Sequence, residues 1–278
     1  MEIRKLFKQY NGQLRDLYPP QESESLVLWL FEHFLGIKRM AILEGIEVEI
    51  PPSLKDAMVA LKQGMPIQYI TQSAPFYGRM FKVNPAVLIP RNETEEMVHL
   101  IIRENKGAGL KILDVGTGSG CIPITLALEM DTPEITAIDV SEDALRIARE
   151  NSAALVVDKT IRFLKIDVLQ EEFPITGLDI LVSNPPYVRE SEKDAMHVNV
   201  LDYEPHLALF VRDEDPLIFY LKIAEKGIAA LKSGGKIYFE INEALGEQVV
   251  ELLSRFGYQN AQIHKDLNDR NRIVSAVR

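Results

Sequence analysis

Cysteine is almost absent from this chain. Its 278 residues include one cysteine, Cys121, so no disulfide can form within the chain. A protein without disulfides is typical of a reducing compartment, and we expect the cytoplasm. Cys121 opens the apolar run 121–128, which indicates a small packing side chain rather than a nucleophile.

Long apolar runs are absent as well. No run approaches the ~20 residues of a membrane-spanning helix, and the first residues are not followed by the apolar region of a secretory signal. Low-complexity tracts and internal repeats are also missing. We therefore expect no membrane association and one large or two modest globular domains.

The chain also lacks an excess of basic residues. Lysine and arginine number 31 against 41 aspartate and glutamate residues, which gives a net charge of 31 − 41 = −10. A chain this acidic is a poor non-specific binder of nucleic acid, because phosphate contacts require a basic surface. We expect no direct nucleic-acid binding, although the total charge is compatible with a local basic patch.

The first 74 residues show helical spacing and no strand pattern. Apolar residues recur every three or four positions, and Pro51-Pro52 and Gly64 have the positions of a helix start and a helix end. No residue in this region has the surroundings of a catalytic group. We therefore predict a small helical domain, residues 1–74, that docks a partner.

Residues 75–91 are predicted to form a β-hairpin linker. Two short apolar runs flank Asn84-Pro85, which is a turn signal. Asn92 is then expected to cap the following helix, with Glu95 three residues later as in a capping box. We interpret the charged residues of 91–95 as charges that belong to a helix start.

Residues 92–278 alternate strand and helix patterns, which predicts an α/β domain with a doubly wound, mostly parallel sheet. One strand ends near Asp114 and runs into a glycine-rich turn, 116–120, and an apolar helix. Glycine lets the backbone approach a ligand closely, and a helix N-terminus offers N–H donors to a negative group. The next two strands end in Asp139 and Asp167, and the first of these positions suits ribose hydroxyls.

The glycine spacing distinguishes between nucleotides. The dinucleotide fingerprint G-x-G-x-x-G/A would place its third small residue at position 121, whereas this chain has Gly120 followed by Cys121. Asp114, two residues before the first glycine, is poorly suited to a pyrophosphate but suits a cationic ligand such as one with an α-amino group. The pattern therefore predicts S-adenosylmethionine (SAM) as the cofactor.

A second signal follows the apolar strand 180–182. Asn184 offers a side-chain amide, Pro185 and Pro186 fix the direction of backbone carbonyls, and Tyr187 offers a flat aromatic face. Such a group suits a planar substrate that carries an NH2 group. A strand exit with a solvent-facing asparagine is the simpler interpretation of the motif alone. Asn184, however, shares its strand-end position with the acidic residues described above, which favours a site.

These stretches together resemble one family. The chain is similar to the class I SAM-dependent methyltransferases that modify the N5 atom of a glutamine in peptide-chain release factors (the PrmC/HemK family). The resemblance extends over nearly the whole chain. The stretches that carry it include Gly64–Ile70, Phe76–Gly78, Leu88–Glu95, Asp114–Gly120, Asn184–Tyr187, Tyr203–Pro205 with Ala208-Leu209, and Lys265–Leu267. Two departures are Asn92, where the family usually has proline, and residues 268–270, where Ala-Gly-Arg is usual.

The resemblance implies roles for individual residues. The residues implied to bind SAM are Asp114, Gly116, Thr117, Gly118, Ser119, Gly120, Asp139, Asp167, Val168 and Asn184. The substrate would be a glutamine in the Gly-Gly-Gln loop of a class I release factor. The residues implied to bind it are Asn184, Pro185, Pro186 and Tyr187, of which Asn184, Pro185 and Tyr187 would have catalytic roles.

The expected mechanism relies on orientation. An amide nitrogen is a poor nucleophile because its lone pair is delocalised. Asn184 Oδ1 and the Pro185 carbonyl are therefore expected to accept both amide hydrogens and direct the nitrogen at the methyl group. A methyltransferase for nucleobase amino groups is the nearest alternative, and a non-catalytic SAM-binding protein is another. The sequence assigns no role to Glu240 or to residues 188–215, which are expected to form a loop over the pocket, and it indicates no metal site.

Overall fold

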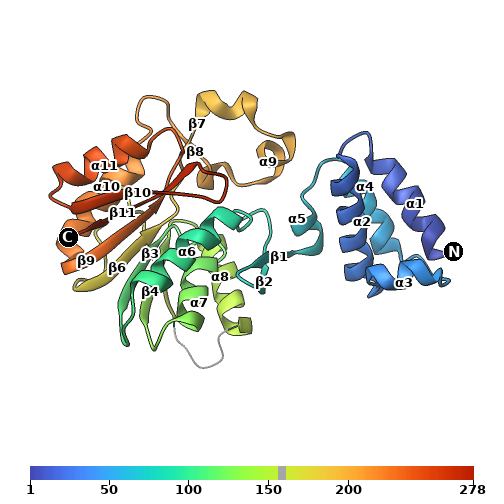
Figure 1. The fold of residues 1–278 in the computed structure, drawn as a ribbon, viewed down its shortest axis with the longest axis horizontal. Coiled ribbons are helices and arrows are strands. Elements are labelled where there is room, and N and C mark those ends of the chain that lie inside the picture. The colour runs from blue at the N-terminus through green and yellow to red at the C-terminus, as the bar shows by residue number, and fades with distance from the viewer. Residues whose placement is uncertain (156–160) are drawn as a thin grey trace. The chain divides into compact units, whose positions relative to one another are not determined.

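The computed structural model describes residues 1–155 and 161–278, and the chain divides into two compact units (Figure 1). The smaller unit comprises residues 1–73 and 197–203, and the larger comprises residues 74–196 and 204–278. Residues 75–91, expected to be a linker, belong to the larger unit. Residues 197–203, expected to be part of a loop, belong to the smaller one.

The smaller unit is helical, as the apolar spacing predicts. Its helices are α1 (Ile3–Leu14), α2 (Pro20–Leu35), α3 (Arg39–Glu44), α4 (Pro52–Lys62), α5 (Ile67–Thr71) and α9 (Val198–Tyr203). In its apolar cluster the Phe31 ring packs against Phe7 and Tyr10, with centroids 6.1 and 6.0 Å away. α9 joins this unit from far along the chain, and the Tyr203 hydroxyl donates to the Gln63 carbonyl at 3.1 Å.

The hairpin lies earlier in the chain than predicted. Its strands are β1 (Ser73–Phe76) and β2 (Arg79–Lys82), joined at Tyr77-Gly78 rather than at Asn84-Pro85. Tyr77 and Gly78 have positive φ values of 48° and 73°, which is the backbone of a type I′ hairpin turn. Asn84 instead forms a local turn in which its side-chain oxygen accepts the Ala86 N–H at 2.9 Å.

The larger unit is built on a seven-stranded sheet with the order β10-β11-β9-β6-β3-β4-β5. The strands are β3 (Lys111–Val115), β4 (Glu134–Asp139), β5 (Ile161–Lys165), β6 (Leu178–Ser183), β9 (Leu231–Glu240), β10 (Gln259–Lys265) and β11 (Asn271–Val277). β5, β4, β3, β6 and β9 pair in parallel, and β11 pairs antiparallel with β9 and β10. This confirms the predicted doubly wound, mostly parallel sheet.

Helices cover both faces of this sheet (Figure 1), and they are α6 (Asn92–Glu104), α7 (Cys121–Glu129), α8 (Glu142–Leu155), α10 (Ile218–Ala230) and α11 (Gly246–Arg255). Side chains of a strand alternate between the two faces. Ile180 and Val182 therefore pack in one apolar cluster with α6 and α7, while Leu181 packs in another with α10 and α11. Gly227 lets α10 come close to the sheet, since a Cβ there would lie 2.6 Å from Leu181 Cδ2.

Residues 188–211 contain more regular structure than expected for a loop. β7 (Val188–Arg189) pairs in parallel with β8 (Phe210–Val211). Between these strands lie α9 and two 3₁₀ helices, Glu190–Ala195 and His206–Ala208.

Two negative findings apply to residues 1–155 and 161–278. No helix there is long and apolar enough to cross a lipid bilayer. No group of three or more histidine, cysteine, aspartate or glutamate side chains there is placed to hold a metal ion.

Candidate active site

A cavity of about 390 Å³ lies at the carboxyl ends of the parallel strands. Four of its wall segments follow strands: 115–119 after β3, 138–141 after β4, 166–169 after β5 and 183–186 after β6. Residues 86–91 line another side. In the sheet, β4 lies on one side of β3, and β6, which comes later in the chain, lies on the other side of β3. The cavity therefore lies at the switch point of the sheet, where open α/β sheets bind ligands.

Most of the site residues predicted from the sequence line this one cavity. The wall includes Gly116, Thr117, Gly118, Ser119, Asp139, Asp167, Val168, Asn184, Pro185 and Pro186. Three predicted residues, Asp114, Gly120 and Tyr187, are not part of it. The glycine-rich turn and the Asn-Pro-Pro segment, which are far apart in the chain, thus share a single space.

The glycine-rich turn needs its glycines for two reasons. Gly116, Gly118 and Gly120 have φ values of 77°, 53° and 79°, in the left-handed region that favours glycine. A Cβ on Gly120 would also lie 3.0 Å from Ile124 Cδ1 and 3.1 Å from Ala148 Cβ. Gly120 therefore supports the turn by letting α7 and α8 pack closely, outside the cavity wall.

Asp139 connects the glycine-rich turn to the end of β4. Its Oδ2 accepts the Gly118 N–H and its Oδ1 accepts the Ser141 N–H, both at 2.9 Å. Burial raises the pKa of this carboxyl group, and the backbone N–H donors act against that rise. Each carboxylate oxygen keeps further acceptor capacity, so Asp139 can accept hydrogen bonds from ligand hydroxyl groups while it holds the turn.

Asp114 is completely buried in β3, next to the glycine-rich turn. Among the described residues, neither carboxylate oxygen has a hydrogen bond of regular geometry, and the same holds for the hydroxyl groups of Thr117 and Ser119. Burial raises the pKa of Asp114 to about 7, although the nearby Thr117 hydroxyl favours the charged form. Unpaired buried polar groups are costly, so this cluster indicates a place for a polar ligand group.

Asp167 and Val168 lie in the segment that follows β5. Asp167 Oδ1 accepts the Leu169 N–H at 2.9 Å, so its carboxylate shapes the turn. The Val168 carbonyl accepts a hydrogen bond from the Lys226 ammonium group at 2.7 Å, and the Glu171 carbonyl accepts another from the same group. Lys226 is buried on α10. It thus fixes one wall of the cavity, and no pattern in the sequence pointed to it.

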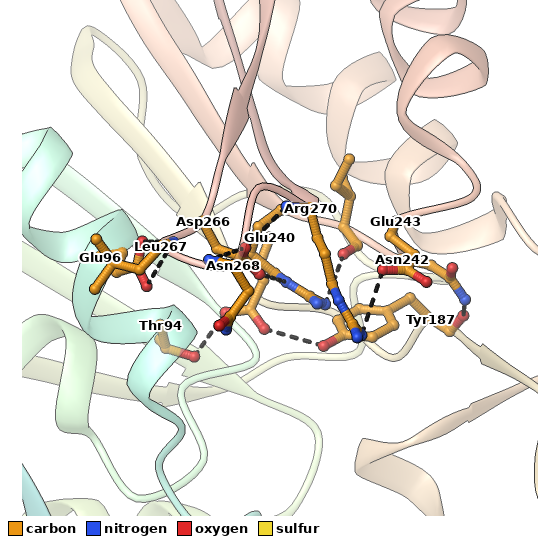
Figure 2. Close-up of polar contacts among 12 residues, drawn as sticks. Thr94, Glu96, Tyr187, Glu240, Asn242, Glu243, Asp266, Leu267, Asn268 and Arg270 are labelled. Carbon is orange, nitrogen blue, oxygen red and sulfur yellow. Dashed lines mark hydrogen bonds and ion pairs between the residues drawn. The ribbon is translucent and has the colours of Figure 1, made fainter. Parts of the chain in front are cut away.

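The hydroxyl groups of Thr94 and Tyr187 converge on one buried carboxylate, that of Glu240 (Figure 2). Asn184 Nδ2 donates to Thr94 Oγ1 at 3.1 Å, and the Thr94 hydroxyl donates to Glu240 Oε2 at 2.6 Å. The Tyr187 hydroxyl donates to Glu240 Oε1 at 3.0 Å. Burial raises the pKa of Glu240, and the Thr94 and Tyr187 hydroxyls oppose the rise. Glu240, to which the sequence assigned no role, therefore has two partners at the site.

Arg91 has a specific partner, which corrects its interpretation as a helix-start charge. Its guanidinium group pairs with Glu204 Oε1 at 2.6 Å, and Glu204 Oε2 accepts the Ile89 N–H at 3.3 Å. The Glu204 side chain is only 1% exposed. The pair joins the cavity-lining residues 89–91 to the long segment that follows Tyr187.

The start of α6 also differs from the prediction. Asn92 is the first helical residue, and Arg91 occupies the cap position without a side-chain cap hydrogen bond. Glu95 Oε1 accepts the Tyr77 N–H at 2.8 Å. Glu95 thus connects the helix to the hairpin turn instead of closing a capping box.

Residues 268–270, one of the two departures from the resembled family, form a turn between β10 and β11 (Figure 2). Asp266 Oδ1 accepts the N–H groups of Asn268 and Arg270, both at 2.9 Å. Asp269 has a φ of 64°, a conformation that glycine adopts without strain and that aspartate tolerates. The departure from the resembled family therefore falls in a turn.

Relatives of known name cover almost the whole chain. Residues 95–203 match the family model described as Methyltransferase small domain. The chain is 44% identical to a release factor glutamine methyltransferase of Bacteroides thetaiotaomicron over 95% of this chain and 96% of that protein. It is 42% identical to a protein of the same name from Flavobacterium psychrophilum over 99% and 98% of the two chains. Identity to the one from Streptococcus pneumoniae is 36%, over 99% and 98%.

Solved structures share the fold at low sequence identity. A methyltransferase from Pyrococcus furiosus matches with a TM-score of 0.53 at 18% identity, over 73% of this chain and 90% of that chain. A ribosomal protein L11 methylase from Lactobacillus delbrueckii matches with a TM-score of 0.50 at 18% identity, over 73% and 86%. At this identity the likeness concerns the fold, and it agrees with the sheet order described above.

Proposed function

The chain belongs to the release factor glutamine methyltransferase family, and we propose that it transfers a methyl group from SAM to the side-chain amide nitrogen of a glutamine in a class I peptide-chain release factor. The observation that carries this proposal is the shared cavity. The glycine-rich turn lines it together with Asn184, Pro185 and Pro186. A methyl donor on the turn and a planar amide on the Asn-Pro-Pro segment would therefore be neighbours.

The residues around the glycine-rich turn fit SAM. Asp139 has acceptor capacity left for ribose hydroxyls, and Val140 and Val168 give the wall apolar surface for an adenine ring. The buried carboxylate of Asp114 and the hydroxyl of Thr117, which have no hydrogen bond of regular geometry within the described residues, suit an α-amino group. When bound there, SAM supplies an electrophilic methyl group, and the chain's own residues hold and orient it.

Asn184 and Pro185 suit the amide group of a glutamine side chain. Asn184 Nδ2 donates one of its two hydrogens to Thr94, so Oδ1 is the side-chain acceptor left for the cavity. Oδ1 and the Pro185 carbonyl would accept the two amide hydrogens, hold the nitrogen in position and stabilise the positive charge that develops on it. The nitrogen loses its proton after methyl transfer, so the residues need not supply a strong base.

The proposal extends to the acceptor and its docking. The glutamine lies in the Gly-Gly-Gln loop of the release factor, and the helical unit docks the factor. The reaction takes place in the cytoplasm. No direct nucleic-acid binding is needed, which is consistent with the net charge of −10.

Methyl transfer from labelled SAM to three acceptors tests the proposal. The acceptors are a class I release factor, the same factor with the glutamine of its Gly-Gly-Gln loop changed to alanine, and mixed DNA and RNA. Label on the intact factor and not on its variant is the expected result. Label on nucleic acid alone, or equal label on the variant factor, overturns the glutamine assignment.

A further inference from the structure

Three buried polar side chains form a series beside the proposed substrate site. Glu240 lies at the end of β9 with 1% of its surface exposed, and Thr94 lies in the first turn of α6 with 3% exposed. Asn184 follows β6 and lines the cavity. Thr94 is in the middle: its hydroxyl oxygen is 2.6 Å from Glu240 Oε2 and 3.1 Å from Asn184 Nδ2.

Counting hydrogens fixes the direction of each bond in the series. A Glu240 carboxylate has only acceptors, so the single hydrogen of the Thr94 hydroxyl goes to Glu240. The 2.6 Å separation is typical of an O–H···O bond to a charged oxygen. The Thr94 oxygen can then only accept a hydrogen from its other neighbour. Asn184 must therefore present its NH2 group to Thr94, and its Oδ1 is left for the cavity.

We propose that Glu240 and Thr94 are positioning residues that set which way the Asn184 amide faces. The two ends of an asparagine amide have nearly the same shape, so packing alone holds both orientations about equally well. In the orientation that the series imposes, Asn184 offers an acceptor to the substrate NH2 group. In the reverse orientation the Asn184 NH2 group would face the substrate NH2 group, and neither could accept a hydrogen bond from the other. This inference rests on the proposed glutamine methylation.

The same carboxylate also determines the position of Tyr187. Glu240 Oε1 accepts the Tyr187 hydroxyl at 3.0 Å, so the ring lies against the apolar cluster of α10 and α11. Glu240 therefore holds both ends of the Asn-Pro-Pro-Tyr segment, Asn184 through Thr94 and Tyr187 directly. Between these ends lie two prolines with fixed φ. A single carboxylate thus orients the whole segment as one stiff piece.

Two substitutions of Thr94 separate hydrogen bonding from packing. Thr94→Val keeps the shape of the side chain and removes its hydroxyl, while Thr94→Ser keeps the hydroxyl and removes a methyl group. We expect Thr94→Val to lower kcat for release-factor methylation on the order of 10- to 100-fold, as for the loss of one oriented group that stabilises developing charge. Thr94→Ser should retain most of the activity. Calorimetric Kd values for SAM should be similar in both variants and the wild type.

The kinetic outcomes decide between the two roles. Wild-type kcat in Thr94→Val overturns the inference, because the hydroxyl would then be dispensable. An equal loss in Thr94→Val and Thr94→Ser also overturns it, because packing would then be responsible. Thermal unfolding of each variant, measured alongside, identifies a loss of activity that comes from a loss of fold.

A second measurement reports the orientation of the Asn184 amide independently of enzyme activity. In NMR spectra of side-chain amides, the Asn184 signal is assigned by its absence in Asn184→Ser. Its hydrogen bound to Thr94 should exchange slowly with solvent in the wild type and in Thr94→Ser, and quickly in Thr94→Val. Fast exchange in the wild type overturns the inference even if the enzyme methylates a release factor. Slow exchange in a protein that methylates no release factor sustains the orientation and overturns the proposed function.

Discussion

The Arg91 guanidinium lies 2.6 Å from the carboxylate of Glu204, whose side chain is 1% exposed. The two residues are 113 positions apart, so the pair closes a long loop of chain that contains the Asn-Pro-Pro-Tyr segment. Removing one partner of a buried ion pair leaves an uncompensated charge, which costs more than the pair contributed. The contact therefore secures one side of the cavity.

Arg91→Ala should destabilise the larger unit. Glu204 would keep its hydrogen bond from the Ile89 N–H but lose its cationic partner. We expect the free energy of unfolding in urea to fall by about 2 kcal/mol, less than for a pair buried on both sides, because Arg91 is one-third exposed. Arg255→Ala, which breaks a pair with Glu251 that is exposed on both sides, should cost less than about 1 kcal/mol. Equal costs in the two variants would contradict this account.

Local signals explain why much of the cavity lining could be predicted from the sequence. Gly116, Asp139 and Asn184 each come at or directly after the end of an apolar strand, and a parallel sheet brings such strand ends to one edge. Alternation of strand and helix patterns was enough to predict the sheet. Each of these inferences needs only residues that are neighbours in sequence.

Long-range pairs explain what could not be predicted. Thr94 and Glu240 are 146 positions apart, and no sequence pattern around either residue indicates that they are in contact. The hairpin was misplaced for a related reason. Tyr77 has a positive φ that a tyrosine adopts only when tertiary contacts support it, such as the bond from its N–H to Glu95. The sequence around Asn84-Pro85 looked like a better turn because propensity alone was available.

Lys226→Met should weaken SAM binding. The substitution keeps the apolar stem of the side chain and leaves the Val168 and Glu171 carbonyls without their ammonium partner. Val168 lines the cavity, so a displaced segment after β5 should raise the Kd for SAM on the order of tenfold, which corresponds to about 1.4 kcal/mol.

Lys222→Met is the matched control for this prediction. Lys222 lies on the same helix, but its ammonium group pairs with a half-exposed Glu225 at 2.9 Å. Its loss should leave the Kd for SAM nearly unchanged in titration calorimetry. A similar rise in Kd for both variants would mean that a general effect on α10 is responsible.

The kcat for methyl transfer should decrease at acidic pH as Glu240 gains a proton. Burial raises its pKa above the ordinary value of 4.5. Protonated Glu240 would donate to Thr94, whose own hydrogen would turn to Asn184 and require Oδ1 there. The productive orientation is therefore present above the Glu240 pKa and lost as the pH falls through it.

The surroundings of Glu240 act on this titration in both directions. Arg272 on β11 lowers its pKa, and Glu93 on α6 raises it. The Tyr187 and Tyr220 hydroxyls and the Cys121 thiol also interact with it.

A kcat profile at saturating substrates, from acidic to alkaline pH, measures the effect. Glu240→Gln cannot titrate, so its profile should lack the acidic fall. Asp114→Asn removes a different carboxyl group whose pKa is raised by burial, and it should retain the fall. An acidic fall that persists unchanged in Glu240→Gln would assign it to another group.

Reversing the polarity of the Glu240–Thr94–Asn184 series should rescue a damaged site. In Asn184→Asp the new carboxylate has no hydrogen for Thr94, whose own hydrogen is bound to Glu240, so two acceptors face each other and kcat should fall. Adding Glu240→Gln supplies an NH2 group that donates to Thr94 and frees the Thr94 hydrogen for the carboxylate at position 184. An acceptor oxygen again faces the cavity.

The double variant should therefore recover kcat by roughly tenfold over Asn184→Asp, which corresponds to about 1.4 kcal/mol. Any loss in Glu240→Gln alone adds to this value in the coupling energy of the double-mutant cycle. The same cycle in a Thr94→Val background should show no coupling, because both changes act through the Thr94 hydroxyl. If the losses in kcat are additive in the protein that retains Thr94, residues 184 and 240 are not coupled through Thr94. Coupling that survives Thr94→Val would mean that they are coupled by another route. We expect coupling when the Thr94 hydroxyl is present and none when it is absent. This result requires a hydrogen-bonded series in which the donor and acceptor of each bond can be exchanged.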